Sequence, residues 1–158
     1  MKKVTHKKNY WLIKSEPTSY SIADLQRDKK TPWTGIRNYL ARNYMRDGMK
    51  VGDLILFYHS SCAVPGVAGI AQVASAPYPD PTQFDPKDYH YEPRAMKEKP
   101  VWYMVDISFI KKYPEVLSLL EMRKHSELHG MQLLRSGNRL SITPVQEAEF
   151  LYVQKLLA

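Results

Sequence analysis

The chain has 158 residues, 44% hydrophobic and 25% charged, a size and composition that suit one globular domain with one core. No apolar run approaches the ~20 residues of a membrane-spanning helix, and no apolar segment follows the basic N-terminal tail, residues 1–8, so a membrane protein and a secretory signal are both excluded. A single cysteine, Cys62, excludes an internal disulfide and a cysteine-based zinc site, and we expect a reducing compartment: the cytoplasm, or the nucleus in a eukaryote.

The net charge of +7 is concentrated in the first third of the chain. Residues 1–50 carry twelve Lys/Arg against four Asp/Glu, whereas residues 51–158 carry eleven against twelve. A local basic excess beside aromatic residues indicates an anionic partner such as nucleic acid. Basic tails and solvated basic helix faces are the alternative explanation.

The first third is predicted to hold one strand and two helices. Residues 9–14 form a strand that Pro17 ends. Ser21 is an N-cap candidate for a short helix that buries Ile22 and Leu25. The following helix is predicted over residues 37–47 and ends at Gly48, with an apolar stripe formed by Ile36, Leu40 and Tyr44.

The middle of the chain is predicted to be mostly strand. Residues 54–58 and 67–76 suit a hairpin or a neighbouring pair. Residues 77–100 hold six of the eleven prolines and four aromatic residues, so we expect an irregular, functional loop or flap that packs down on the domain. Residues 101–110 alternate and are rich in β-branched side chains, which predicts a long strand, and residues 115–123 are predicted to be helical.

The C-terminal part is predicted to hold a short strand over residues 139–142 and a final helix. Thr143 is the expected N-cap, Pro144 the first helical residue, and Gln146 the partner in a capping box. Strands in the middle and helices at the edges predict an α+β fold, a small, strongly bent sheet or barrel with helices packed outside it.

The strongest functional candidate is a base-binding pocket around Trp33. This tryptophan follows a proline and lies just before a basic helix, where a flat ring can act as a stacking wall. Trp11 and Trp102 lie in predicted strands and are expected in the core, and a half-buried packing role is the alternative for Trp33. Hydrogen-bonding groups for the base come from Ser15, Glu16, Thr34 and Asn38. The far side of the pocket is closed by Tyr58, His59 and Ser60. Positive charge for the phosphates comes from Lys14, Arg37, Arg42 and Arg46.

Glu16 has two interpretations of equal weight. Its carboxylate can accept hydrogen bonds from the exocyclic amine of a cytosine-type base. It can equally be an ion-pair partner of Arg37 or Lys14.

Hydrolytic and metal sites are weaker candidates. His59 and Ser60 are adjacent in a strand and point to opposite faces, so they do not form a nucleophile–base pair there, and Cys62 is expected to be a plain loop or core thiol. His125 and His129 have helical spacing, but the glutamate of the metalloprotease motif is missing. We therefore expect no metal and no cofactor.

Several motifs together resemble the EVE domain family. They are Trp11-Leu-Ile-Lys-Ser-Glu-Pro17, Trp33-Thr-Gly-Ile-Arg-Asn38 with Ala41-Arg42, Gly52-Asp53, Phe57-Tyr-His-Ser60, Tyr78-Pro-Asp80, and Trp102 with Val105-Asp106. The resemblance extends from about Asn9 to Leu157, and we expect residues 9–158 to form a single EVE domain. It implies a PUA-like fold, a small mixed β-barrel with flanking helices, related to the YTH domains that read methylated adenine in RNA.

The resemblance also implies a function. Trp33 and Thr34 match the aromatic-wall position of YTH domains, whereas Glu16 stands where those domains usually carry an amide, which argues against simple transfer of their specificity. We therefore expect a non-catalytic domain that reads a modified base, in DNA (modified cytosine) or in RNA. The alternatives are an enzyme that uses His59 or Glu16 as acid or base, and a binder of a small ligand or a protein in the same groove.

Overall fold

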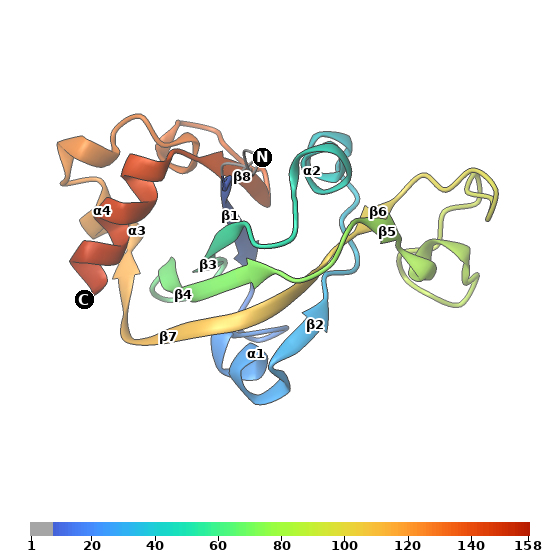
Figure 1. Ribbon diagram of the computed structural model, residues 1–158, viewed down its shortest axis with the longest axis horizontal. Helices are drawn as coiled ribbons and strands as arrows, with labels where there is room; N and C mark the ends of the chain where they lie inside the picture. The colour runs from blue at the N-terminus through green and yellow to red at the C-terminus, as the bar shows by residue number, and fades with distance from the viewer. Residues whose placement is uncertain (1–7) are drawn as a thin grey trace, which may run out of the picture.

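A mixed sheet lies at the centre of the fold (Figure 1). The computed structural model describes residues 8–158, so the basic tail expected at residues 1–8 lies outside the described residues except for Lys8. Within residues 8–158, six strands form one sheet in the order β2-β7-β4-β3-β1-β8, and β5 pairs with β6 apart from it. β1 and β3 run parallel, while the other neighbours are antiparallel. The edge strands β2 and β8 do not pair with each other, so the sheet is open, where the sequence predicted a small barrel.

The strands differ widely in length. They are β1 (Tyr10–Ser15), β2 (Lys30–Pro32), β3 (Leu54–His59), β4 (Gly66–Val73), β5 (Tyr78–Pro79), β6 (Tyr103–Met104), β7 (Asp106–Ser118) and β8 (Ile142–Val145). The α-helices are α1 (Ile22–Asp28), α2 (Tyr39–Asn43), α3 (Leu119–Met122) and α4 (Glu147–Leu157). A π-helical turn over Tyr44–Gly48 and 3₁₀ turns over Pro81–Phe84, Ser126–Leu128 and Gln132–Leu134 complete the regular structure. No helix within residues 8–158 is long and apolar enough to cross a membrane.

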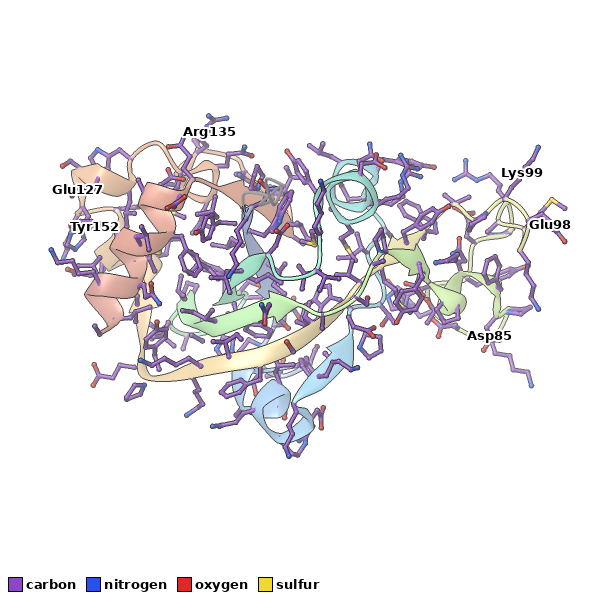
Figure 2. All side chains as sticks on the ribbon, viewed as in Figure 1. Asp85, Glu98, Lys99, Glu127, Arg135 and Tyr152 are labelled. Carbon is purple, nitrogen blue, oxygen red and sulfur yellow. The ribbon has the colours of Figure 1, made fainter. Side chains whose placement is uncertain are left out.

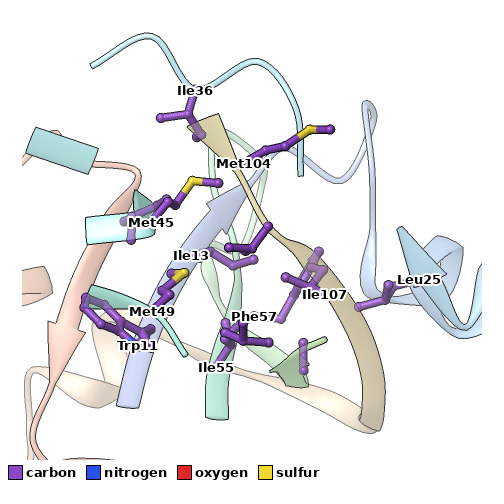
Figure 3. Packing of buried hydrophobic residues seen from close by; sticks show 14 of the residues in the cluster. Trp11, Ile13, Leu25, Ile36, Met45, Met49, Ile55, Phe57, Met104 and Ile107 are labelled. Atoms are coloured by element: carbon purple, nitrogen blue, oxygen red, sulfur yellow. The ribbon is translucent and has the colours of Figure 1, made fainter. Parts of the chain in front are cut away.

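Helices cover both faces of the sheet, so alternate residues of β1 enter two different cores. Trp11 and Ile13 pack in a first cluster with side chains of α1, α2 and the π-turn, which Figure 3 shows. Leu12 packs in a second cluster with side chains of α3 and α4. A strand whose two faces are both buried is continuously apolar, which explains why this stretch shows no alternation of apolar and polar residues.

The N-terminal predictions are confirmed. β1 covers most of residues 9–14, and Ser21 caps α1: its hydroxyl accepts the Asp24 N–H at 3.1 Å, while the Asp24 carboxylate accepts the Ser21 N–H at 2.8 Å. Ile22 and Leu25 are buried as predicted. β3 and β4 are the predicted antiparallel neighbours.

The helix predicted over residues 37–47 is shorter and irregular. α2 begins at Tyr39, because Asn38 is the N-cap, and the last turn widens into the π-turn that ends at Gly48. The predicted apolar stripe is wrong at Leu40, which is 46% exposed. Ala41 and Met45 are the buried positions instead.

Residues 115–118 are strand, where a helix was predicted over residues 115–123. β7 continues through Pro114 and pairs with β4 up to Ser118, so only Leu119–Met122 are helical. The pairing is interrupted between Val67 and Gly69, which accommodates a proline without an N–H. A Cβ at Gly66 or Gly69 would collide with the β7 backbone, so these glycines allow the two strands to approach closely.

The last helix begins later than predicted. Thr143 and Pro144 belong to β8, and the predicted strand over residues 139–142 shares only Ile142 with it. Pro144 is tolerated because β8 is an edge strand that pairs only with β1. Gln146 is the N-cap, and its backbone N–H donates to the Glu149 carboxylate at 2.9 Å.

Much of the predicted loop over residues 77–100 belongs to an arm that projects beyond β5 and β6 (Figure 1). We call residues 80–102 the arm. Tyr78 and Phe84 are partly buried near its base, but Tyr89 is 96% exposed. The prediction that this segment packs down is therefore wrong for its outer part.

Candidate functional site

A cavity of about 280 Å³ opens where β1 ends beside β2 and the loop that follows β2. It is lined by Ser15, Tyr20, Thr31, Pro32, Trp33 and Thr34. Ser15, Trp33 and Thr34 were predicted from the sequence, and the structure brings them together. Tyr20, Thr31 and Pro32 were not predicted.

Trp33 is fixed in place while lining the cavity. Its backbone N–H donates to the carbonyl of Val105 at 2.9 Å. Its indole lies nearly perpendicular to the ring of Tyr20, at a centroid distance of 6.0 Å, and to that of Phe57, at 5.8 Å. The half-buried ring thus packs against the first core cluster and also forms a wall of the cavity. The two interpretations of Trp33 made from the sequence both describe part of its position.

Ser15 and Tyr20 give the cavity a polar side with defined hydrogen-bond roles. The buried Ser15 hydroxyl donates to the Tyr20 carbonyl at 2.5 Å, which leaves its oxygen lone pairs as acceptors. The Tyr20 hydroxyl donates to the Asp28 carboxylate at 2.8 Å. Burial, together with this hydrogen bond, raises the pKa of Tyr20, so the phenol stays protonated at neutral pH.

The cavity combines aromatic rings with hydroxyl groups. Thr31 and Thr34 add two side-chain hydroxyls to that of Ser15, and each hydroxyl can donate or accept a hydrogen bond. Trp33 and Tyr20 supply apolar ring surface. This arrangement suits a small planar ligand with a polar edge.

Glu16 and Asn38 are not among the residues that line the cavity. Glu16 follows Ser15 directly and is exposed, while its carbonyl accepts the N–H groups of Ser19 and Tyr20. The Asn38 side-chain oxygen accepts the Ala41 N–H at 3.1 Å as the cap of α2. The polar end of Asn38 is therefore engaged at the helix, whereas the Glu16 carboxylate stands at the surface next to the cavity.

Tyr58, His59 and Ser60 lie behind the cavity. Tyr58 is 3% exposed and belongs to the second core cluster, on the other face of the sheet. The His59 Nε2 accepts the Ile22 N–H at 3.1 Å, at the start of α1. The Ser60 N–H donates to the Ser15 carbonyl at 2.9 Å, which fixes the end of β1. These residues support the site without lining it.

His59 is held as a neutral acceptor. Burial lowers the pKa of His59, and a ring nitrogen that accepts a backbone N–H carries no proton of its own. An imidazole fixed in this way is poorly placed to act as an acid or base for a ligand in the cavity.

Arg37 fastens the arm to the body. Its guanidinium donates to the Asp80 carboxylate at 3.2 Å, to the Thr82 hydroxyl at 3.0 Å and to the His90 carbonyl at 2.7 Å. It also lies over the Trp102 ring, 5.3 Å from the centroid. Burial alone would raise the pKa of Asp80, but hydrogen bonds from Thr82, Gly35 and Arg37 hold it below its usual value.

The other predicted phosphate ligands are also mostly engaged. Arg42 donates to the Val101 carbonyl at 2.8 Å and lies over the Tyr39 ring at 4.9 Å. Arg46 pairs with Asp47 at 2.8 Å. Lys14 is half-buried, and burial lowers its pKa.

A basic residue that the sequence analysis did not select also adjoins the cavity. Lys30 directly precedes the lining residue Thr31 and is exposed. Lys30 lies on the short strand β2, which pairs with β7, and the sequence does not reveal this pairing.

Comparisons with known proteins identify the family. The sequence profile of the EVE domain matches residues 9–156. The chain belongs to the EVE domain family. Thymocyte nuclear protein 1 of Gallus gallus is 41% identical to it over 165 aligned positions. The alignment covers 93% of this chain and 68% of that protein.

Solved EVE-family structures have the same fold. A protein from Leishmania major superposes with a TM-score of 0.90 at 45% identity, covering 95% of this chain and 94% of that one. The human THYN1 protein, solved in complex with DNA that contains 5-methylcytosine, superposes with a TM-score of 0.87 at 36% identity, covering 94% of this chain and 97% of that one.

Proposed function

We propose that this protein is a non-catalytic domain that binds nucleic acid and holds a modified base in the cavity beside Trp33. The observation that carries the proposal is this cavity, with its aromatic walls and hydroxyl groups, in a chain whose human relative was solved with 5-methylcytosine-containing DNA. Modified cytosine in DNA is accordingly the first target to test, and modified RNA the second.

The cavity offers the groups that such a base needs. A base must leave the stack to enter a pocket of this kind, and an aromatic wall replaces part of the lost stacking. The Trp33 ring supplies that wall, and the hydroxyls of Ser15, Thr31 and Thr34 face the base edge. The exposed Glu16 carboxylate, next to Ser15, can accept from the exocyclic amine of a cytosine.

Three further points support or follow from the proposal. The engagement of His59 with the Ile22 N–H argues against acid–base catalysis by His59 and so favours binding without turnover. The open mixed sheet with helices on both faces is consistent with a PUA-like architecture whose barrel is incomplete. The family profile over residues 9–156 supports residues 9–158 acting as one domain. Such a domain would act in a compartment that holds nucleic acid, the cytoplasm or the nucleus.

The test is the affinity of the Trp33→Ala variant for matched oligonucleotides with and without 5-methylcytosine. We expect the parent to prefer the modified oligonucleotide, and the variant to lose about 1–3 kcal/mol of binding free energy, the usual contribution of one stacked base. Trp33→Phe should retain part of the preference, since it keeps a ring at the wall. Leu120→Ala, a truncation of a residue that is 71% exposed on α3, is the control. A folded Trp33→Ala variant that keeps the preference of the parent contradicts the proposal.

A further inference from the structure

The arm is a projection whose base is anchored by hydrogen bonds. Figure 1 shows it extending beyond β5 and β6, and Figure 2 places Asp85, Glu98 and Lys99 at this end of the molecule, opposite to Glu127 and Tyr152. The buried Gln83 side chain closes the base of the arm: it donates to the carbonyls of Asp80 and Trp102 at 2.8 and 2.6 Å, and accepts the N–H groups of Val101 and Trp102, both at 2.9 Å. These bonds join both ends of the arm.

Large aromatic side chains are exposed on the arm. Tyr89 is 96% exposed and Tyr91 40%, and they line a cavity of about 450 Å³ together with Arg37, His90, Glu92 and Trp102. Single exposed aromatic residues are common on protein surfaces. A group of them around a concave surface is typical of a binding site.

The arm cavity borders an aromatic stack that continues onto α2. Tyr39 is 49% exposed and stacks on Trp102, with a centroid distance of 4.9 Å and an interplanar angle of 29°. Guanidinium groups lie over both rings, Arg42 over Tyr39 and Arg37 over Trp102. Alternating rings and guanidinium planes are the groups on which unpaired bases stack.

The loop after β2 connects this surface to the cavity at Trp33. The Gly35 N–H donates to the Asp80 carboxylate at 2.8 Å, and a Cβ at Gly35 would lie 2.9 Å from the His90 Nε2. Trp33 lines one cavity and Arg37 the other. The backbones of Trp33 and Arg37 are at most ~14 Å apart, since four residues span no more than that, and this is about the rise of four stacked nucleotides at ~3.4 Å each. A short stretch of one strand can therefore pass from one cavity toward the other.

We propose that the arm is a second nucleic-acid contact, in which Tyr89 and Tyr91 stack on an unpaired base of the strand that flanks the base held beside Trp33. This inference rests on the proposed function. Stacking of this kind tolerates any base, so the arm adds affinity and a preference for unpaired flanks without changing which modification is read. Among the charged side chains of the arm, the exposed Lys87, Lys97 and Lys99 are those that can contact the phosphates of that flank.

The test compares the Tyr89→Ala/Tyr91→Ala double variant with the parent on two single-stranded DNAs that carry one 5-methylcytosine. One DNA has about 12 nucleotides and the other about three, since single-strand sites typically span ~4–16 nucleotides. We expect the double variant to bind the longer DNA at least about fivefold more weakly and the shorter one equally well. Its preference for modified over unmodified DNA should stay unchanged. Tyr89→Phe/Tyr91→Phe should restore the affinity, because the stacking rings return.

The outcomes separate the two proposals. A parent that binds neither DNA at low salt removes both the proposed function and the arm contact. If the parent reads the modified base and the double variant binds the longer DNA equally well, the proposed pocket is supported and the arm contact is overturned. The exposed tyrosines would then bind a protein partner instead. Equal losses on both DNAs also overturn the arm contact, because the effect would then not come from the flank. Thermal unfolding of the variants confirms folding, and Leu120→Ala is the matched control.

Discussion

His59 shows how one side chain supports the candidate pocket from outside it. By accepting the Ile22 N–H, it satisfies one of the backbone donors that a helix leaves free at its first turn. It also packs on Phe57 at a centroid distance of 5.8 Å, and Phe57 in turn contacts Trp33. The position of the Trp33 ring therefore depends partly on a neutral imidazole.

The stability provided by His59 should depend on pH. Burial lowers the pKa of His59 in the folded protein below its unfolded value of about 6.5, so its contribution is complete above pH ~6.5 and is lost as the pH falls through the folded pKa. We expect His59→Ala to lower the free energy of unfolding by about 1–3 kcal/mol at neutral pH, because a buried donor is left unpaired, and by less in acid.

Urea unfolding of the parent and the variant across this pH range measures the difference. His129→Ala, at an exposed histidine, controls for general effects of losing an imidazole. A deficit of the His59→Ala variant that is the same at acid and neutral pH would show that its protonation is not linked to folding.

Part of the lining of the cavity beside Trp33 could be predicted residue by residue from the sequence. Trp33, Thr34 and Ser15 could be predicted because they stand beside turns and strand ends in recognisable motifs. Thr31 could not, since it enters the cavity through the pairing of β2 with β7, a contact between residues far apart in the chain. Tyr20 is placed instead by the turn after β1, where its N–H donates to the Glu16 carbonyl and its carbonyl accepts the Ser15 hydroxyl. Arg37 and Arg42 looked like free cations because the sequence does not reveal their partners in the arm, whereas Arg46 pairs with its sequence neighbour Asp47.

Among the elements, the arm and the loop after β2 are joined mainly through Arg37. The Asp80 side chain is fully buried and the Arg37 side chain is 22% exposed, so this ion pair is shielded from solvent. Removing one member of a shielded pair leaves the other charge uncompensated, which costs more than the pair itself contributes.

Arg37→Ala should therefore destabilise the protein by about 3 kcal/mol and loosen the arm. Adding Asp80→Asn to Arg37→Ala should recover part of this loss, because the uncompensated charge is removed. Urea unfolding of both variants gives the free energies, and limited proteolysis reports the exposure of the arm. A loss below about 1 kcal/mol for Arg37→Ala would place the pair among weak surface salt bridges.

Local sequence signals predicted elements well where contacts are local and poorly where they are not. The N-cap of α1 is a local signal, and Ser21 was predicted as that cap from the sequence. By contrast, Glu115–Ser118 have an apolar spacing that also suits a helix, and only the pairing of Leu117 with Val67 decides for a strand. Thr143-Pro144 imitates a helix start, yet its pairing with β1 makes it an edge strand.

For the whole molecule, the net charge of +7 should govern the strength of nucleic-acid binding more than its selectivity. Several of the arginines in the first third are engaged by neighbouring groups. We therefore expect exposed lysines such as Lys30 to supply much of the attraction for phosphates.

We expect the affinity for an unmodified oligonucleotide to fall about tenfold or more when monovalent salt rises from about 50 to 200 mM, which corresponds to two or more neutralised phosphates. The ratio of affinities for modified and unmodified oligonucleotides should change little, because stacking and hydrogen bonds in the cavity involve no counterions. Fluorescence anisotropy titrations at several salt concentrations test both statements. Affinity independent of salt would instead favour a neutral small ligand in the same cavity.

The way in which the arm is attached also lets its outer part vary. The chain leaves the body at Tyr78 and returns at Met104, two residues that pair directly between β5 and β6. A loop of another length or composition can join these two points without altering any pairing of the six-stranded sheet. The outer part of the arm can therefore vary without disturbing the cavity beside Trp33, provided that Asp80, Thr82 and His90 keep their hydrogen bonds to Gly35 and Arg37.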